Sequence, residues 1–503
     1  MQCEPAFPAF EATYAAGQGQ VVMTRLIADL ETPVSAFLKL AEGRAYAGLF
    51  ESVEGGATIG RYSFIVMKPD LIWRCRGDKA EINRRARFDA EAFEPLPGSP
   101  LDSLKRLIRE CRFPLPEGLP PMAAALVGYM GYDTVRLMEK LPAENGPVLD
   151  VPDGLFMRPT VVAVFDRVED VVTVFSPVWP QPGVTARAAY NQALERLSDV
   201  VADFERSLPQ RREALDLEAE LPKPSANMTP EQFKAMVNRA KEYVLAGDIF
   251  QVVLAQRFAV PFQLPPFALY RALRRLNPSP FLVYADFGGF SVVASSPEIL
   301  VRLRGGKVTI RPLAGTRKRG ADPAEDKALI EDLLADPKER AEHLMLLDLG
   351  RNDVGRVAQI GSVEVTEQFG IELYSHVMHI VSHVEGRIRP EYDAVDALVA
   401  GFPAGTVSGA PKVHAMEIIE ELEPDRRGLY GGCLGYFGAN GDMDTCIALR
   451  TAIVKDGTMY VQAGAGIVAD SVPESEHQEC VNKARALVRA AEEAVRFAAR
   501  RGN

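Results

Sequence analysis

The chain has 503 residues, enough for one large hydrophobic core or two to three ordinary ones, and 47% hydrophobic with 25% charged residues is an ordinary globular composition. Its net charge of −11 argues against a nucleic-acid partner, because no excess of basic side chains is available to neutralise phosphates. Six scattered cysteines without CxxC spacing favour free thiols over a disulfide framework. With no signal-like N-terminus and no long apolar stretch, we expect a cytoplasmic protein that does not enter a membrane.

The first part of the chain predicts a mixture of short helices and strands. Thr32 and Pro33 start a helix over residues 34–41, as N-cap and first helical residue. Residues 49–56 and 61–66 predict a hairpin, residues 123–132 and 160–175 further strands, and residues 185–206 a helix. A polar stretch at 207–227 predicts a linker, so we expect an N-terminal region of residues 1–222 and a domain of residues 223–503.

The second part predicts sheets joined by short turns. A capping box at Thr229 starts a helix to about residue 246, followed by an apolar strand at 249–254 that contains Gln251. Strands recur from residue 281, and turns such as Gly305-Gly306 indicate antiparallel pairing. The pattern lacks the strand–helix alternation of parallel sheets. We therefore predict an α+β fold with large antiparallel sheets that form a sandwich flanked by helices.

Residues 339–357 predict a helix with acids on an apolar face. Helical spacing places Glu342, Leu346, Leu349 and Asp353 on one side of it. A carboxylate on such a face must meet a cation or a hydrogen-bond donor. A salt bridge to a nearby arginine would satisfy Glu342, and so would a hard divalent ion such as Mg²⁺. The helix alone leaves both interpretations open.

Several other polar features are not required by packing. Glu298 ends a strand, Gly315-Thr316 forms a tight turn, Lys412 opens a helix that runs to residue 422, and Arg450 ends another strand. Anions bind helix N-termini, and the guanidinium group of arginine can donate two parallel hydrogen bonds to one carboxylate. The glycine-rich run Gly464-Ala465-Gly466 and the acid Glu479 follow. This set predicts a small substrate with several carboxylates, held partly through a metal ion.

Two further patterns have competing interpretations. His376, His379 and His383 would share a helical face and suggest zinc, but the Val and Ile around them favour a strand. Cys433, within Gly-Cys-Leu-Gly, resembles the nucleophile turn of triad glutaminases, with His477 downstream. Such a nucleophile needs a strand–turn–helix elbow, and the intervening sequence has room only for hairpins. We therefore do not expect Cys433 to be a nucleophile.

Taken together, the motifs resemble the chorismate-binding enzymes, and within them the anthranilate synthase component I family. The resemblance is carried over nearly the whole chain by LFESVEGG, GDIFQVVLAQR, NPSPF, ASSPE, RPLAGTRKRG, AEHLMLLDLGRNDVGRV, HVMHIVSHVEG, FPAGTVSGAPK, YGGCLGYFG, DTCIALRTA and QAGAGIVADSVPESEHQE. It implies that ammonia adds to chorismate as the 4-hydroxyl leaves, and that pyruvate is then eliminated to give anthranilate.

The resemblance also implies roles for individual residues. Glu342 and Glu479 would hold Mg²⁺, Glu298 would be the general acid, and His379 would serve the elimination step. The substrate contacts it implies are Gly315, Thr316, Lys412, Tyr430, Arg450, Gly464, Ala465 and Gly466. A tryptophan effector site would contain Ser52, Pro280, Phe281 and Leu282. Relatives often have Tyr-Met in place of Phe281-Leu282, which bears on the strength of inhibition.

Two positions separate the related activities. Aminodeoxychorismate synthases, the alternative assignment, commonly carry a nucleophilic lysine where this chain has Ala314. Isochorismate and salicylate synthases use a lysine base where this chain has Gln251, and an amide cannot deprotonate water. Both differences favour anthranilate. The chain shows no glutaminase domain, so the resemblance implies a separate glutamine amidotransferase subunit in a heterotetramer. A tryptophan-binding scaffold without activity is disfavoured by the presence of Glu298, His379 and both acids of the metal site, Glu342 and Glu479.

Overall fold

A computed structural model describes residues 1–54, 58–142, 145–146, 149–208, 223–374 and 377–501. Its helices are α1 (Phe7–Ala15), α2 (Pro33–Leu40), α3 (Pro100–Glu110), η1 (Pro121–Ala123), η2 (Tyr132–Leu137), α4 (Ala186–Phe204), α5 (Pro230–Ala246), α6 (Pro266–Leu276), α7 (Pro323–Ala335), α8 (Pro337–Gly355), α9 (Ala394–Gly401), η3 (Gly405–Val407), α10 (Lys412–Leu422) and α11 (Pro473–Arg501).

The strands are β1 (Gln20–Ile27), β2 (Ala47–Glu54), β3 (Thr58–Arg76), β4 (Lys79–Asn83), β5 (Glu94–Leu96), β6 (Ala125–Met130), β7 (Gly154–Asp166), β8 (Val171–Val178), β9 (Ser225–Ala226), β10 (Gln251–Pro261), β11 (Phe281–Asp286), β12 (Ser291–Ser296), β13 (Ile299–Arg304), β14 (Lys307–Ile310), β15 (Leu313–Lys318), β16 (Glu364–Leu373), β17 (Val377–Arg387), β18 (Gly409–Ala410), β19 (Cys433–Gly438), β20 (Met443–Ile447), β21 (Thr451–Lys455) and β22 (Thr458–Ile467).

The paired strands are antiparallel, and together with the flanking helices they confirm the predicted α+β class. The sheet runs through both predicted parts of the chain, since β2 pairs with β11 and β6 pairs with β19. Residues 209–222 lie outside the described residues, and most of the expected linker falls among them. The division at residue 222 therefore stays a prediction. Strands from the two sides of residue 222 pair with each other in one sheet.

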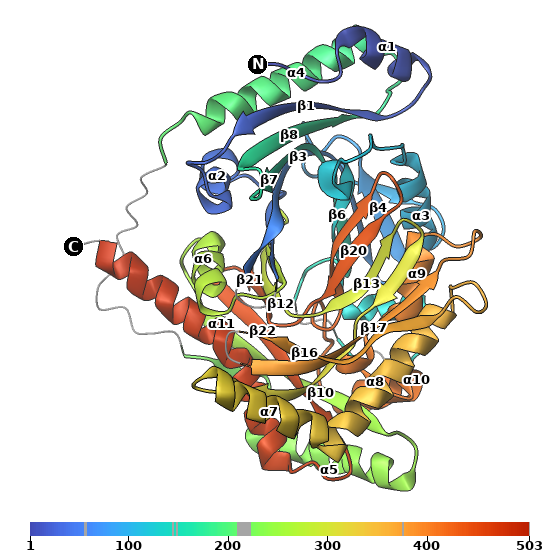
Figure 1. Cartoon of the computed structure of the whole chain (residues 1–503), viewed down its shortest axis with the longest axis vertical. Coiled ribbons are helices and arrows are strands. Elements are labelled where there is room, and N and C mark those ends of the chain that lie inside the picture. The colour runs from blue at the N-terminus through green and yellow to red at the C-terminus, as the bar shows by residue number, and fades with distance from the viewer. Residues whose placement is uncertain (55–57, 143–144, 147–148, 209–222, 375–376, 502–503) are drawn as a thin grey trace.

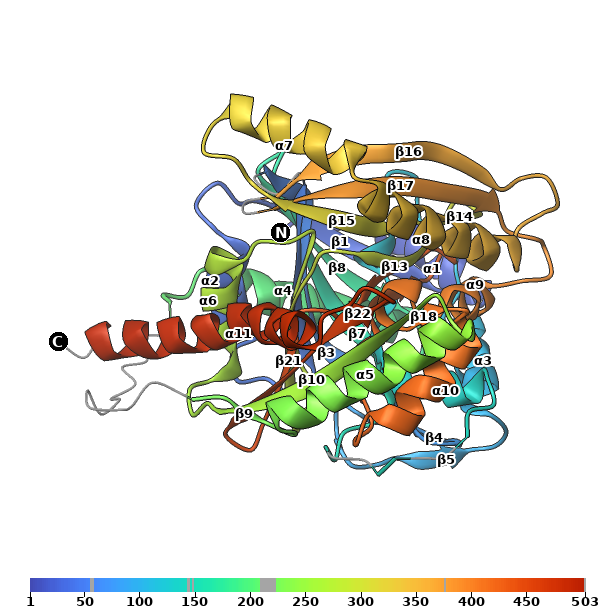
Figure 2. The same cartoon turned by 90° about the horizontal axis from the view of Figure 1, so that it is seen from below.

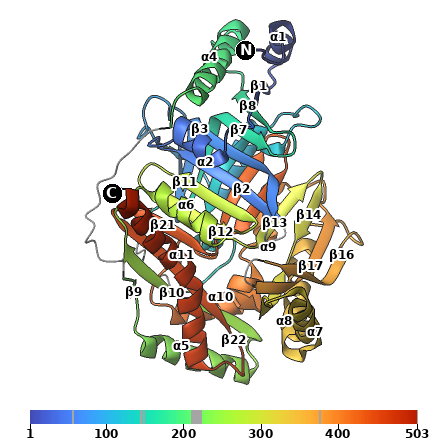
Figure 3. The same cartoon turned by 60° about the vertical axis from the view of Figure 1, so that its left-hand side comes forward.

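Helices cover the outer faces of these sheets. α4 and α1 lie beyond β1 and β8 at one end of the molecule, and α11 runs along α6, α5 and β22 (Figure 1). α7 and α8 cover β15 and β17 on another side (Figure 2). Figure 3 shows β3, β7, β2 and β11 side by side in front of the C-terminal strands. The arrangement is a layered sandwich with helices outside.

The hydrophobic core has parts enclosed by strands and parts under helices. Phe50, Phe64, Tyr129 and Tyr436 lie between strands of the two halves of the chain, where Phe50 and Phe64 stack at 4.7 Å between ring centroids. Trp73 is fully buried beneath α3 and donates its indole N–H to Ser103. Burying a large aromatic side chain stabilises the fold by about 2–3 kcal/mol, so these rings fix the two halves against each other.

Local sequence signals mark many element boundaries correctly. Thr32 and Thr229 cap α2 and α5, each with a reciprocal capping box and a proline at the first helical positions. Gly305 and Gly306 both have positive φ in the β13–β14 turn, as a tight hairpin requires. The strands predicted over residues 160–175 are two, β7 and β8, paired with each other across a turn at residues 167–170. Residues 55–57, between β2 and β3, lie outside the described residues.

Candidate active site

One cavity of about 1060 Å³ brings together most of the predicted site residues. Its walls come from the β12–β13 connection, β15, β17, β22, α8 and α11, which are far apart in sequence. The predicted residues that line it are Glu298, Gly315, Thr316, Glu342, His379, Tyr430, Arg450, Gly464, Gly466 and Glu479. Acids, a histidine, an arginine and bare backbone therefore face one space large enough for a small organic substrate.

Glu298 is a buried carboxyl group on the cavity wall. Only 7% of it is exposed, and burial raises its pKa to about 8. The hydroxyl of Thr406 donates to Oε2 at 3.2 Å, and the backbone N–H of Ile447 holds the carbonyl oxygen of Glu298 at 3.0 Å. The side chain is therefore protonated near neutral pH, which suits a general acid.

His379 presents one ring nitrogen for chemistry. Its Nδ1 lies 3.1 Å from the carbonyl oxygen of Gly315 and 3.0 Å from Oγ1 of Thr316. A carbonyl oxygen only accepts hydrogen bonds, so Nδ1 carries the proton and Nε2 keeps a lone pair. Burial lowers the pKa of His379 to about 4, so the ring is neutral at physiological pH. His379 lies in β17, which confirms the predicted strand; His383 lies there too, and His376 lies outside the described residues.

The turn predicted at Gly315-Thr316 is wrong, because both residues lie within β15, where the pairing with β17 is irregular. This segment and Arg450, both predicted to contact substrate, have unusual backbones. Gly315 has φ +71°, at an irregularity in the pairing of β15 with β17, and an added Cβ would come within 3.0 Å of Ile380. Arg450, between β20 and β21, has φ +47°, which is strained for a residue with a side chain. The N–H of Ser295 holds the Arg450 carbonyl oxygen at 3.1 Å. The two conformations bring both residues to the same cavity wall.

Tyr430 and the glycine-rich strand β22 form another part of this wall. A Cβ added to Gly464 would lie only 2.8 Å from the hydroxyl oxygen of Tyr430, so a side chain at position 464 would collide with it. Gly464 and Gly466 line the cavity. Ala465 is fully buried in the core on the other face of β22, so its side chain cannot reach a substrate in this cavity. Only its backbone remains available for the predicted contact.

Glu342 and Glu479 meet in the cavity from two different helices, α8 and α11. Burial raises the pKa of Glu342, and the carboxylates of Glu339 and Glu479 raise it further. Within the described residues, no cluster of three His, Cys, Asp or Glu side chains could hold a metal. Mg²⁺ is commonly held by one or two carboxylates and the substrate, so this pair of mutually repelling acids fits that ion.

Lys412 is placed differently from the other predicted substrate contacts. It begins α10, as predicted, but its ammonium group bonds both carboxylate oxygens of Asp353 at 2.9 Å, and it does not line the cavity. The pair joins α10 to α8. A structural role accounts for this geometry directly, and substrate contact by Lys412 stays a prediction.

The residues predicted for an effector site lie away from this cavity. Leu282 pairs with Glu51 between β11 and β2, so Ser52 and Phe281 follow at adjoining positions, with Pro280 just before β11. The guanidinium group of Arg61, in β3, pairs with Asp166 and not with Glu51. Glu51 is instead buried and accepts hydrogen bonds from residues that include Tyr270, Arg274 and Arg167.

Two cavity residues were not singled out from the sequence. Lys483 lies one helical turn after Glu479, pairs with it at 2.7 Å, and donates to the Gly464 carbonyl oxygen at 2.9 Å. The i,i+4 spacing of an acid and a lysine could have indicated it. Thr406 belongs to the quoted FPAGTVSGAPK motif, but nothing local shows that its partner is Glu298.

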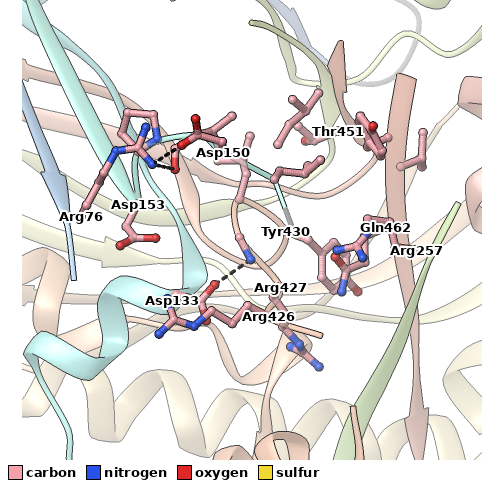
Figure 4. A pocket seen from close by; sticks show the side chains of 18 of the residues that line it. Arg76, Asp133, Asp150, Asp153, Arg257, Arg426, Arg427, Tyr430, Thr451 and Gln462 are labelled. Atoms are coloured by element: carbon pink, nitrogen blue, oxygen red, sulfur yellow. Dashed lines mark hydrogen bonds and ion pairs between the residues drawn. The ribbon is translucent and has the colours of Figure 1, made fainter. Parts of the chain in front are cut away.

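A second cavity of about 410 Å³ lies behind Tyr430. It shares Tyr430, Val461 and Gln462 with the first, so these side chains separate the two spaces. Figure 4 shows Tyr430 and Gln462 on one side of the second cavity and Asp133 on the other.

Cys433, at the start of β19, is buried, and burial raises the pKa of its thiol to about 12. It stands in an antiparallel strand and not in a nucleophile elbow, as expected.

Comparison with known proteins identifies the family of this chain. Residues 68–489 match the protein family described as chorismate binding enzyme. The chain is 60% identical over 498 residues to anthranilate synthase component 1 of Cereibacter sphaeroides, covering 99% of both chains. The chain belongs to the anthranilate synthase component 1 family. It is also 47% identical over 473 residues to that component of Aquifex aeolicus, covering 93% of this chain and 94% of the relative.

A solved structure supports both the family and the fold. Anthranilate synthase component I from Streptococcus pneumoniae superposes with a TM-score of 0.75 at 36% sequence identity, covering 92% of this chain and 99% of that one. The predicted chorismate-utilising fold is therefore confirmed. Among the residues that the structure describes, no helix is long and apolar enough to span a membrane.

Proposed function

We propose that this chain is the synthase component of an anthranilate synthase, which converts chorismate and ammonia to anthranilate, pyruvate and water. The observation that carries the proposal is the gathering of an acid, a neutral histidine, an arginine and two further carboxylates in one cavity, on a chain 60% identical to such a component. Each group has a task that the reaction requires.

In the first half of the reaction, the ammonia nitrogen bonds to ring carbon 2, the ring double bonds shift, and the bond from carbon 4 to its hydroxyl oxygen breaks. The added nitrogen then loses one proton to solvent and becomes the amino group. Hydroxide is a poor leaving group, so the departing oxygen needs a proton. Glu298, with its pKa raised to about 8, is protonated at neutral pH and gives that proton, so that water leaves. The carboxylate it leaves behind is stabilised by the hydroxyl of Thr406.

In the second half, ring carbon 2 loses its proton and the bond from carbon 3 to the enolpyruvyl oxygen breaks. Nε2 of His379 accepts the proton, because Nδ1–H is held by the Gly315 carbonyl oxygen. The electron pair of the broken C–H bond completes the aromatic ring of anthranilate. The released enolpyruvate takes up a proton at its terminal carbon and becomes pyruvate.

The substrate carboxylates are bound by cationic and backbone groups of this chain. Arg450 offers a planar pair of donors, and Gly464 and Gly466 leave the backbone of β22 open to close approach. Glu342 and Glu479 would hold Mg²⁺, which when bound supplies positive charge to a substrate carboxylate. Lys483 lies beside them and balances part of their charge.

The nitrogen source and regulation complete the proposal. Gln251 and Ala314 line the cavity where related enzymes carry lysines, so ammonia is the nucleophile and no covalent lysine intermediate forms. A separate glutamine amidotransferase subunit supplies the ammonia in a cytoplasmic heterotetramer, in keeping with the name component 1 of the relatives. Tryptophan binds near Ser52, Pro280, Phe281 and Leu282 and inhibits the enzyme.

The test is product identification with the purified chain, chorismate, Mg²⁺ and ammonium. Anthranilate and pyruvate in equal amounts support the proposal. An aminodeoxychorismate that accumulates without pyruvate would move the chain to the alternative activity.

A further inference from the structure

Thr406 is the side chain whose hydroxyl meets the carboxyl group of Glu298. Its Oγ1 donates to Oε2 at 3.2 Å across 108 residues of sequence, and both residues line the reaction cavity. We infer that Thr406 is a positioning residue, which holds the Glu298 carboxyl in the orientation that delivers its proton to the departing oxygen. The inference rests on the proposed function, in which Glu298 is the general acid.

The segment that carries Thr406 is anchored on both sides. Nη1 of Arg427 donates to the Val407 carbonyl oxygen at 2.6 Å, and the hydroxyl of Ser408 donates to the Ala404 carbonyl oxygen at 2.8 Å. Arg427 is itself buried and held by two bonds to Glu423, at 2.9 and 2.5 Å. Arg427 also lines the second cavity, which Figure 4 shows. The Thr406 hydroxyl is therefore in place before any substrate binds.

A fixed donor on Oε2 biases the position of the acidic proton. In a protonated carboxyl group the carbonyl oxygen is the better acceptor, so a donor to Oε2 favours the proton on Oε1. When that proton moves to the hydroxyl oxygen of chorismate, the bond from carbon 4 breaks and water leaves. The new negative charge is shared by both oxygens, and the hydrogen bond from Thr406 becomes charge-assisted and stronger. Thr406 thus stabilises the transition state more than the ground state.

Other charged groups also face Glu298, and a change at Thr406 leaves them in place. Arg311 and Arg450 favour its ionised form, and the N–H of Leu313 donates to the carboxyl group. Tyr374 interacts with it electrostatically. His379, Glu342, Glu479 and Lys483 share the same cavity, and Asp353 borders a small neighbouring space lined by both Glu298 and Thr406. Their effects are common to wild type and variant.

The experiment compares Thr406→Val with Thr406→Ser in the full chain, using chorismate, Mg²⁺ and saturating ammonium. Valine keeps the shape of threonine and removes the donor, whereas serine keeps the donor. We expect the valine variant to lose about tenfold in kcat with little change in KM for chorismate, because a hydrogen bond to a charged group is lost. The serine variant should stay close to wild type.

The pH dependence separates positioning from a simple structural defect. Without the Thr406 donor the ionised form of Glu298 is less stable, so its pKa rises and the alkaline decline in rate moves to higher pH. The ratio of valine-variant to wild-type rate, in which the ionisation of ammonia cancels, should therefore increase between pH 7 and 9. A ratio that stays constant over this range, or a serine variant as slow as the valine variant, would overturn the inference. If the wild type forms no anthranilate, the proposed function fails first.

Discussion

Glu298→Gln is the substitution for which the structure predicts opposite effects on activity and stability. Glutamine has the shape and hydrogen-bonding pattern of the protonated acid but cannot give up a proton. General acid catalysis contributes about 10²–10⁴-fold, so kcat should fall by that factor. Stability should change in the other direction at alkaline pH, because the buried carboxylate is costly to ionise.

The size of the stability effect follows from the pKa. Burial raises the pKa of Glu298 from 4.5 to about 8. The folded and unfolded pKa values of Glu298 differ by about 3.5, and one pKa unit corresponds to about 1.4 kcal/mol. Ionisation of the buried carboxylate therefore lowers the free energy of unfolding by up to about 5 kcal/mol. With about 2 cal/mol/K of unfolding entropy for each of the 503 residues, this corresponds to about 5 °C in Tm.

The sign depends on pH. Below about pH 4.5 the carboxyl group is protonated in the folded and unfolded chain, so the wild type pays no ionisation cost. As the pH rises from 4.5 to 8, the unfolded chain ionises while the fold retains the proton, and the wild type loses stability. Above pH 8 the loss is complete. The Tm of Glu298→Gln relative to wild type should therefore be higher at pH 9 than at pH 5.

Thermal unfolding at both pH values, together with anthranilate fluorescence, tests this prediction. Glu117→Gln is the matched control, since Glu117 is exposed and its replacement should leave the Tm difference independent of pH. Equal Tm differences at pH 5 and pH 9 for Glu298→Gln would refute the buried-acid argument. Near-wild-type turnover would refute the assignment of Glu298 as proton donor.

Three further substitutions test other parts of the site. Glu342→Gln should raise the Mg²⁺ concentration for half-maximal rate at least about tenfold, since a charged ligand is lost; a wild-type Mg²⁺ titration would remove Glu342 from the metal site. Ser52→Phe should preserve turnover and relieve tryptophan inhibition, and unchanged inhibition would exclude Ser52 from the effector site. Lys412→Met should lower the free energy of unfolding by about 3 kcal/mol by leaving Asp353 buried without its cation, and adding Asp353→Asn should restore most of it. A higher KM for chorismate with an unchanged free energy of unfolding would instead support substrate contact by Lys412.

Local patterns predicted much of the fold, because its helices and turns carry their own signals. The capping residues Thr32 and Thr229 and the turn at Gly305-Gly306 act within a few residues and could be read directly. The split of residues 160–175 into β7 and β8 was less visible, since the turn at 167–170 contains neither glycine nor proline. Asp170 supplies the positive φ there instead.

The pairings within the site could not be read in this way, because they join distant segments. Helical spacing correctly placed Glu342 and Asp353 on α8, but only the fold shows that Glu342 faces the cavity and that Asp353 takes Lys412 as its partner. Glu51 pairs with Arg167 from the β7–β8 turn and with Arg274 from α6, and no local pattern indicates either partner. Charge and burial in the sequence indicate that a partner is needed, and tertiary structure decides which one.

The most direct test of the account is the reaction itself. The purified chain would be mixed with chorismate, Mg²⁺ and ammonium at mildly alkaline pH, and anthranilate fluorescence followed with and without tryptophan. The account predicts anthranilate and one equivalent of pyruvate, with a rate that tryptophan suppresses. An amino product that is not anthranilate, or no turnover of chorismate, would contradict it.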